Sequence, residues 1–399
     1  MCEVPSRRTV WQTPESSRRS SGVIKKSSLA VIFKSDDKIH WPMAVTGDRI
    51  RKILEDYDKD NLVIATACSH TSLQIFDGAR KEGFKTLGIA VGQKTKFYDA
   101  FPRGKPDEFF YIDSYTHLLD RAKELVEKNV IIVPHGSFVE YMTPKNFEEL
   151  EVPTFGNRHV LEWESDRDKE REWLSGAGLE MPHKIEDPKM IDRPVLVKYD
   201  GAKGGRGFFI AKDYPDFKLG IDHSQKFSIQ EYILGTRYYI HYFYSPIRTE
   251  GYKLSKGVLE MLSIDRRDES NIDEIYKLGA TEELKKLGHY PTFVVTGNVP
   301  VVVRESLLPK LLSMGESAVE KSIELFGGMI GPFCLECIVT DDLKVKVFEI
   351  SSRIVAGTNP FIAGSPYSEL LEPGISTGRR IAQEIGYAKD NGRLGEVVS

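Results

Sequence analysis

The sequence has few cysteines, no long apolar run and no excess of one charge, and each shortage excludes a class of protein. Four cysteines are too few to hold 399 residues together by disulfides, which agrees with a reducing compartment. No apolar run approaches the roughly 20 residues that span a bilayer, and the N-terminus lacks a continuous apolar signal core. The formal charge of -4 offers no cation excess for nucleic acid. We therefore expect a cytoplasmic protein with neither a membrane nor a nucleic acid as partner.

The usual phosphate-binding fingerprints are also missing. The glycine-rich stretch 194–212, PVLVKYDGAKGGRGFFIAK, has neither the spacing of a P-loop nor that of a dinucleotide-binding loop. It reads as a strand carrying Lys198, a loop and a second strand. The loop offers bare backbone and cations suited to a polyphosphate, at Gly201, Lys203, Gly204, Gly205, Arg206 and Gly207. An ordinary glycine-rich hairpin turn is the alternative.

The first part of the chain predicts an extension followed by a small α/β domain. Residues 1–45 are poor in periodic apolar positions and are expected to be a disordered extension. Helical patterns at 46–57, 73–82 and 115–128 then alternate with strand patterns at 62–67, 86–91, 109–112 and 130–133. This alternation is typical of a doubly wound parallel sheet, which we assign to 46–155.

Two polar loops follow strands of this sheet, at its carboxyl edge, where such domains bind ligands. The first, 68–72, contains His70 and Thr71 at a helix start, which favours an anion. The second, 134–137, places His135 and Ser137 at the matching end of another strand. The alternative for the first loop is plain N-capping by Ser69 or Thr71, with His70 merely exposed.

The last third of the chain contains two apolar strands that each carry one carboxylate. Glu336 lies in 333–339 and Glu349 in 345–350, on either side of a turn, so the strands form a hairpin. Because a charge in a central strand is costly unless it is paired or bound, the two carboxylates predict a site for a hard cation such as Mg²⁺. Edge-strand glutamates facing water are the alternative. Arg353 follows, suited to a γ-phosphate or an acyl phosphate.

A zinc site is a weaker reading of the same strand. Cys334 and Cys337 form a C-x-x-C motif, but residues three apart on a strand face opposite sides of the sheet. No second C-x-x-C or paired histidine completes such a site. Before this region, a charged helical pattern covers 159–176 and an aromatic strand pattern covers 238–244, whose tyrosines are expected to pack a sheet.

In their order along the chain, these features resemble an ATP-grasp enzyme. Lys198 on a strand, a glycine-rich hairpin, Gln230-Glu231-Tyr232-Ile233, Glu336, and Glu349-x-Ser-x-Arg353 carry the resemblance over about 156–384. The stretches ATACSHTSLQIFDGARKEGFKTLGIAVG, VPHGSFVEY and FEISSRIVAGTNP are similar, more closely, to archaeal formate-dependent synthetases of 5-formaminoimidazole-4-carboxamide ribonucleotide (FAICAR). The closer match spans nearly the whole chain after Thr46.

The resemblance implies a fold, ligands and residue roles. It implies mixed α/β and α+β architecture, with the parallel-sheet domain, a lid subdomain at 156–235 and a metal-binding subdomain at 236–399. Its ligands are ATP, Mg²⁺ or Mn²⁺, formate and 5-aminoimidazole-4-carboxamide ribonucleotide (AICAR), in a homo-oligomer. The implied catalytic residues are Lys198 and Arg353, and the implied metal ligands are Glu336 and Glu349. The implied ATP contacts are Lys198, Gly201, Lys203, Gly204, Gly205, Gly207, Glu231, Tyr232, Ile233 and Glu269; the implied ribonucleotide contacts are His70, Thr71, Ser137 and Asn298.

The implied reaction activates formate with ATP and transfers the formyl group to the amine of AICAR. Two departures from the pattern are the extension, which the family lacks, and Ser351, where many ATP-grasp enzymes carry Asn. Two other functions stay open: an ATP-grasp ligase for another acid or amine, and a non-catalytic nucleotide-binding regulator. Activity assays with formate and other small acids would separate the three.

Overall fold

The computed structural model describes residues 45–92, 94–199, 208–269 and 294–399, and the structural statements below concern these residues. The predicted extension at 1–45 lies outside this part except for Val45. None of the helices in the described ranges is both long enough and apolar enough to cross a membrane.

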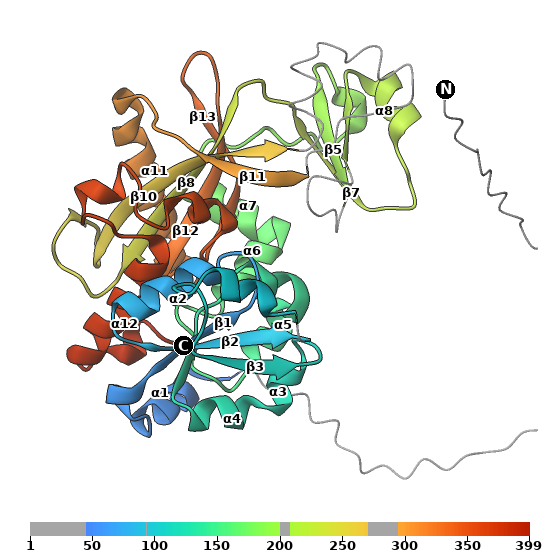
Figure 1. The fold of residues 1–399 in the computed structure, drawn as a ribbon. Helices are drawn as coiled ribbons and strands as arrows, with labels where there is room; N and C mark the ends of the chain where they lie inside the picture. The colour runs from blue at the N-terminus through green and yellow to red at the C-terminus, as the bar shows by residue number, and fades with distance from the viewer. Residues whose placement is uncertain (1–44, 93, 200–207, 270–293) are drawn as a thin grey trace, which may run out of the picture. The chain divides into compact units, whose positions relative to one another are not determined.

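Four parallel strands form the first sheet, in the order β3-β2-β1-β4. The strands are β1 (Val63–Ala67), β2 (Lys85–Val91), β3 (Glu108–Ile112) and β4 (Val130–Ile132). The accompanying helices are α1 (Gly47–Glu55), α2 (Ser72–Lys81), α3 (His117–Asp120), α4 (Ala122–Glu127) and α5 (Pro144–Glu148). The central strands are apolar and buried on both faces, as expected of a parallel sheet between helices. The predicted parallel α/β domain is confirmed (Figure 1).

The C-terminal helix α12 (Thr377–Asp390) packs against α2 of this first domain. The two backbones approach closely at Gly78 and Gly378, where a Cβ on either glycine would overlap the other helix. The chain end is also tied here, because Ser399 and Thr154 exchange backbone hydrogen bonds of 2.9 Å. The last helix therefore covers the sheet formed by the first third of the chain.

A small antiparallel sheet of three strands has the order β6-β5-β7. It contains β5 (Val195–Tyr199), β6 (Phe208–Ala211) and β7 (Phe227–Glu231), with helix α8 (Tyr214–Gly220). Val195, Val197 and Ile229 form its own apolar core with Phe217 of α8. The predicted strand, loop, strand arrangement around Lys198 is confirmed, since β5 and β6 pair as an antiparallel hairpin.

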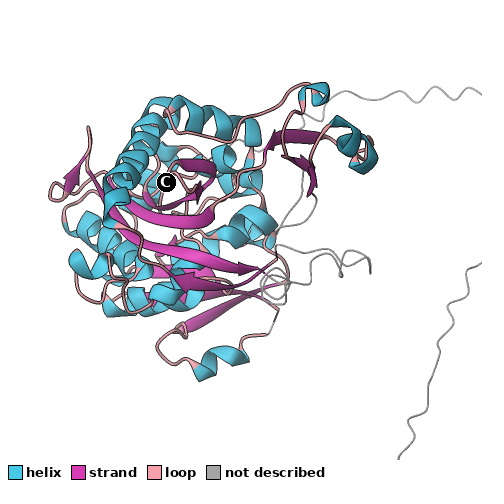
Figure 2. Cartoon of the chain, turned by 90° about the horizontal axis from the view of Figure 1, so that it is seen from above, coloured by secondary structure: helices cyan, strands magenta, loops and turns pink. Residues whose placement is uncertain are grey.

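The largest sheet has six strands, in the order β11-β10-β8-β12-β13, with β9 beside β10. Its strands are β8 (Thr236–Ser245), β9 (Tyr252–Lys253), β10 (Val258–Glu269), β11 (Val295–Pro300), β12 (Gly331–Val339) and β13 (Val345–Ser351). One face is apolar and shares a core with α11 (Leu308–Phe326) and α7 (Arg167–Gly176). Figure 2 shows these long strands together with the helices.

Two helices expected to be continuous are broken, so those predictions are wrong. The pattern at 115–128 forms α3 and α4, separated at Arg121, whose side chain bonds Glu124 and the Tyr111 carbonyl. The pattern at 159–176 forms α6 (Val160–Ser165) and α7, because Asp166 is extended and its carboxylate accepts the N–H groups that begin α7. At Asp166 the hydrogen bonds from the side chain to the backbone compete with helix continuation.

Candidate active site

One face of the six-stranded sheet is polar, and it carries the predicted site residues Asn298, Glu336 and Glu349. Since side chains alternate along a strand, positions in register with Glu336 share its face. These positions are Tyr239 and His241 on β8, Asp265 and Arg267 on β10, Asn298 on β11, Cys334 and Glu336 on β12, and Glu349 on β13. The alternate positions, such as Ile240 and Leu335, belong to the apolar core on the other face.

The two predicted metal ligands are cross-strand partners, as their hairpin placement suggested. Glu336 pairs with Glu349, and the next pair is Cys337 with Val347, so Phe348 is an extra residue in β13. This bulge keeps both carboxylates on the polar face while the residues around them stay in the core. Glu336 is 5% exposed and accepts a hydrogen bond from Arg267 Nη2 at 3.1 Å.

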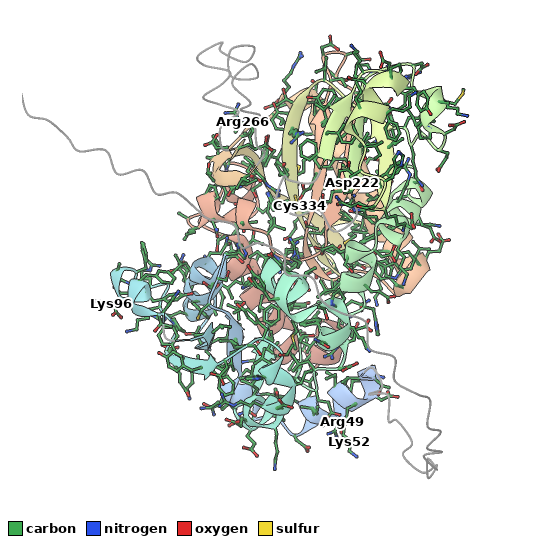
Figure 3. The ribbon with its side chains drawn as sticks, turned by 90° about the vertical axis from the view of Figure 1, so that its right-hand side faces the viewer. Arg49, Lys52, Lys96, Asp222, Arg266 and Cys334 are labelled. Carbon is green, nitrogen blue, oxygen red and sulfur yellow. The ribbon has the colours of Figure 1, made fainter. Side chains whose placement is uncertain are left out.

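Cys334 and Cys337 lie on opposite faces, as expected. Cys334, labelled in Figure 3, packs with Tyr239 and Val355, whereas Cys337 belongs to the large core. In contrast, Arg49 and Lys52 project from α1 at the surface in the same view. Neither cysteine has a second metal ligand of the kind the zinc alternative requires, so the part of the chain seen here gives that alternative no support.

An open cleft of about 670 Å³ lies in front of Glu349. Its walls include Lys198 of β5, Gln230 of β7, and the helix residues Glu164 and Glu170. The Glu349 side chain still meets solvent within the cleft. Partial loss of hydration is the main cause that raises the pKa of Glu349 to about 7, and the negative charge of Glu336 is the second cause. The same loss of hydration lowers the pKa of Lys198. Cation and carboxylate thus face a shared space large enough for a nucleotide.

Glu164 and Glu170 are site residues that the sequence reasoning missed. Glu170 Oε1 accepts the backbone N–H of Ile350 at 2.7 Å, and Glu164 Oε2 accepts that of Ser352 at 2.8 Å. The two carboxylates thus accept backbone N–H groups on the edge of β13 that no other strand pairs with, since β13 is the edge strand of the sheet. Burial raises the pKa of both carboxylates. A sequence signal existed, because Glu164 follows Leu161 by three residues and Glu170 precedes Trp173 by three, which places each on a buried helix face.

Arg353 lies where the polar face meets the first domain. Its Nη2 donates to Glu164 Oε1 at 2.7 Å, while its buried Nε has no hydrogen-bond partner. The neighbouring Ile354 forms a parallel bridge with His135, and a Cβ added at Gly136 would lie 4.0 Å from Arg353 Cζ. Arg353, which was predicted to bind a phosphate, therefore borders the loop at 134–137, which was predicted to bind the second substrate.

The two loops at the carboxyl edge of the parallel sheet face each other. The rings of His70 and His135 are 5.9 Å apart, and the hydroxyls of Thr71 and Ser137 are both buried without a hydrogen bond to any residue that the structure describes. His70 is exposed, as the N-capping alternative expected, but Thr71 makes no side-chain capping hydrogen bond to α2. Buried hydroxyls are normally hydrogen-bonded, so an unpaired hydroxyl on each of the two facing loops fits a polar ligand bound between them.

His135 holds these two loops together in its neutral form. A carbonyl can only accept, so His135 Nε2–H donates to the Ala67 carbonyl at 2.9 Å, and Nδ1 accepts the Ser137 N–H at 3.2 Å. Burial lowers the pKa of His135 to about 4, so the ring is uncharged at neutral pH. Its role is to fix the Ser137 loop against β1.

The remaining predicted contacts are placed as follows. Glu231 is the last residue of β7 and follows Gln230, which lines the cleft. The Tyr232 N–H donates to the Pro194 carbonyl at 2.9 Å. This hydrogen bond keeps residues 231–233, including Ile233, next to β5. Glu269 accepts a hydrogen bond from Arg237 at 3.0 Å. The predicted loop residues Gly201, Lys203, Gly204, Gly205 and Gly207 lie outside the described residues.

The donor set at Glu336 and Glu349 fits a hard divalent cation shared with phosphates. In the described ranges no three His, Cys, Asp or Glu side chains converge as a metal cage. Two adjacent carboxylates beside a cleft are, however, what Mg²⁺ commonly uses when substrate phosphates and water supply its other ligands.

Comparison with solved structures defines the class. The IMP biosynthesis protein PurP from Thermococcus kodakaraensis has a TM-score of 0.65 at 31% identity, covering 84% of this chain and all of that one. An ADP complex of N5-carboxyaminoimidazole ribonucleotide synthetase has a TM-score of 0.59 at 11% identity, covering 81% and 76%. The biotin carboxylase domain of Hydrogenobacter thermophilus 2-oxoglutarate carboxylase, with MgADP, has a TM-score of 0.55 at 14% identity, covering 81% and 69%. The protein has the ATP-grasp fold, as predicted.

Comparison with known sequences then gives the family. A relative from Methanococcoides burtonii, the 5-formaminoimidazole-4-carboxamide-1-(beta)-D-ribofuranosyl 5'-monophosphate synthetase, is 63% identical over 355 residues, covering 89% of this chain and all of the relative. Two family models also match: a protein of unknown function (DUF1246) at 64–185 and a domain of unknown function (DUF1297) at 219–399. The chain belongs to this family of FAICAR synthetases.

Proposed function

We propose that the protein uses ATP and formate to formylate the 5-amino group of AICAR, giving FAICAR, ADP and phosphate. The observation that carries the proposal is the pairing of two half-sites: the carboxylate and lysine cleft at Glu349 and Lys198, and the orphan hydroxyls of Thr71 and Ser137. Arg353 borders both. Membership of the FAICAR synthetase family supports this choice of acid and amine. Cytoplasmic location and a homo-oligomer stay predictions.

The first half-reaction takes place in the cleft. A formate oxygen attacks the γ-phosphorus of ATP, the bond from phosphorus to the bridging oxygen breaks, and ADP leaves, giving formyl phosphate. Lys198 binds the phosphates and Arg353 stabilises charge on the transferred group. Glu336 and Glu349 would hold Mg²⁺ or Mn²⁺, and the bound cation would neutralise phosphate charge. The glycine-rich loop around Gly204, with Glu231, Tyr232, Ile233 and Glu269, binds the rest of the nucleotide.

The second half-reaction takes place at the edge of the parallel sheet. The 5-amino nitrogen attacks the formyl carbon, the carbon–oxygen bond to phosphate breaks, and the nitrogen loses a proton. His70, Thr71, Ser137 and Asn298 bind the ribonucleotide for this step. The weak aromatic amine needs a good leaving group more than a strong base, and phosphate fulfils that need.

Release of ADP, with each substrate left out in turn, tests the proposal. We expect ADP only when ATP, a divalent cation, formate and AICAR are all present, with one FAICAR formed for each ADP. Turnover that persists without formate, or that requires acetate or bicarbonate in its place, would reassign the acid. An absence of turnover with any small acid would favour a regulatory nucleotide-binding protein.

A further inference from the structure

The polar face of the six-stranded sheet contains a buried group that the reaction above does not use. Asp265 on β10 is fully buried, and His241 on β8 is 2% exposed. His241 Nε2 and Asp265 Oδ1 form a short hydrogen bond, and Asn298 Nδ2 donates to Asp265 Oδ2 at 2.9 Å. A buried carboxylate is costly without partners, so two donors on two neighbouring strands account for its stability there.

These bonds fix the orientation of the Asn298 amide. An ionised carboxylate has no proton to give, so only the NH₂ side of the amide can face Asp265. The carbonyl Oδ1 of Asn298 is then turned away from Asp265, and it has no hydrogen-bond partner among the residues that the structure describes. Asp265 thus sets the direction in which Asn298 Oδ1 points from β11, and His241 in turn holds Asp265 in place.

The same carboxylate lies against the segment that reaches the ribonucleotide loop. The short helix η6 (Ala356–Phe361) packs on β10 and β11, and a Cβ at Gly357 would overlap the Asp265 carboxylate. Two residues further on, Asn359 Nδ2 donates to the His70 carbonyl at 3.3 Å. Asp265 is therefore connected by direct contacts both to Asn298 and, through η6, to the loop that carries His70.

We propose that Asp265, held by His241, is a positioning residue that turns the Asn298 carbonyl toward the ribonucleotide, where it accepts an N–H group of the aminoimidazole carboxamide. This inference rests on the function proposed above, in which Asn298 contacts AICAR. The arrangement gives specificity as well as binding, because a fixed acceptor favours a base that offers an N–H donor at that position. In this proposal Asp265 contacts no substrate, and its effect on the KM for AICAR passes through Asn298 rather than through η6.

Steady-state kinetics of Asp265→Asn test the proposal. This variant has nearly the same shape, but its neutral amide no longer requires the NH₂ side of Asn298. We expect the KM for AICAR to rise about tenfold, as for loss of one oriented hydrogen bond, while the KM values for ATP and formate stay within twofold. Ser263→Ala is the matched control, since Ser263 is a buried polar residue on the same strand whose hydroxyl has no partner; it should leave all three KM values unchanged.

A double variant separates positioning from general damage. If Asp265 acts through Asn298, Asp265→Asn should add less than twofold to the AICAR KM of Asn298→Ala. An equal rise in both backgrounds, or a rise shared by ATP, would overturn the proposal. Should Asp265→Asn not fold, His241→Leu asks the same question, because it removes the donor that holds Asp265. Wild-type protein inactive toward AICAR would refute the proposed function instead, which distinguishes the two failures.

Discussion

The carboxylate of Glu164 gives the sharpest single test of how the site is built. It accepts the Ser352 N–H at 2.8 Å and pairs with Arg353 at 2.7 Å, with side-chain exposures of 7% for Glu164 and 16% for Arg353. Glu164→Gln preserves the size and one acceptor oxygen but removes the charge that holds the guanidinium. The perturbation thus acts on the position of Arg353 and leaves its identity intact.

The structure sets the expected size of the effect. Breaking a buried ion pair by removing one partner costs about 3–5 kcal/mol. Because Arg353 still meets some solvent and the Ser352 bond survives, we expect the lower end of that range, about 3 kcal/mol of unfolding free energy. A displacement of the guanidinium by about 1 Å should lower kcat/KM about 100-fold. The matched control is Glu162→Gln on the same helix, whose partner Lys169 is at the surface; its unfolding free energy should change by less than about 0.5 kcal/mol.

Urea unfolding and coupled ADP release measure the two effects. Both should be recorded for Glu164→Gln and Glu162→Gln under the same conditions. If Glu164→Gln kept kcat/KM within threefold of wild type, Arg353 would not depend on Glu164 for its position, and the assignment of Glu164 to the site would be refuted.

Three further outcomes are expected. Glu349→Gln should lower ADP release by about 100-fold or more, since one metal ligand is lost, while AICAR binding measured by calorimetry stays unchanged; retained turnover would contradict the metal assignment. Gly78→Ala should lower the unfolding free energy by about 1–3 kcal/mol through overlap with α12, whereas Gly386→Ala, whose Cβ would have its nearest neighbour at 3.7 Å, should not. The pKa of His135 is about 4 when folded and about 6.5 when unfolded, so its contribution to stability is full above pH 6.5 and is lost, by about 3 kcal/mol, as the pH falls to 4. In His135→Gln, the unfolding free energy measured by urea unfolding should fall less between pH 6.5 and pH 4 than it does in the wild type.

The strands that carry charge were predictable from the sequence, for a physical reason. A carboxylate within an apolar strand must have a partner, so Glu336 and Glu349 stand out without any knowledge of the fold. The apolar run before Lys198 placed it correctly on a strand. The two loops at Thr71 and Ser137 were placed together because parallel strands bring their carboxyl ends to one edge of the sheet.

The helix carboxylates were not predictable in the same way. The spacing of Glu164 and Glu170 from buried apolar residues marks their helix face, but only the edge of β13 shows which backbone groups their carboxylates bind. Asp166 was likewise read as part of one helix, although it caps a new one. The pairing of His241 with Asp265 depends on strand register across residues 24 apart, which no local pattern contains.

The most direct test of the central claim, that ATP activates formate, follows the oxygen atoms of formate into the products. One oxygen of formate bonds to phosphorus in formyl phosphate and leaves with phosphate when the amine attacks. With formate labelled with ¹⁸O at both oxygens, we predict one ¹⁸O in each phosphate released and one in each formyl group. Phosphate without label would mean that formate never bonded to the γ-phosphorus, and would contradict the account.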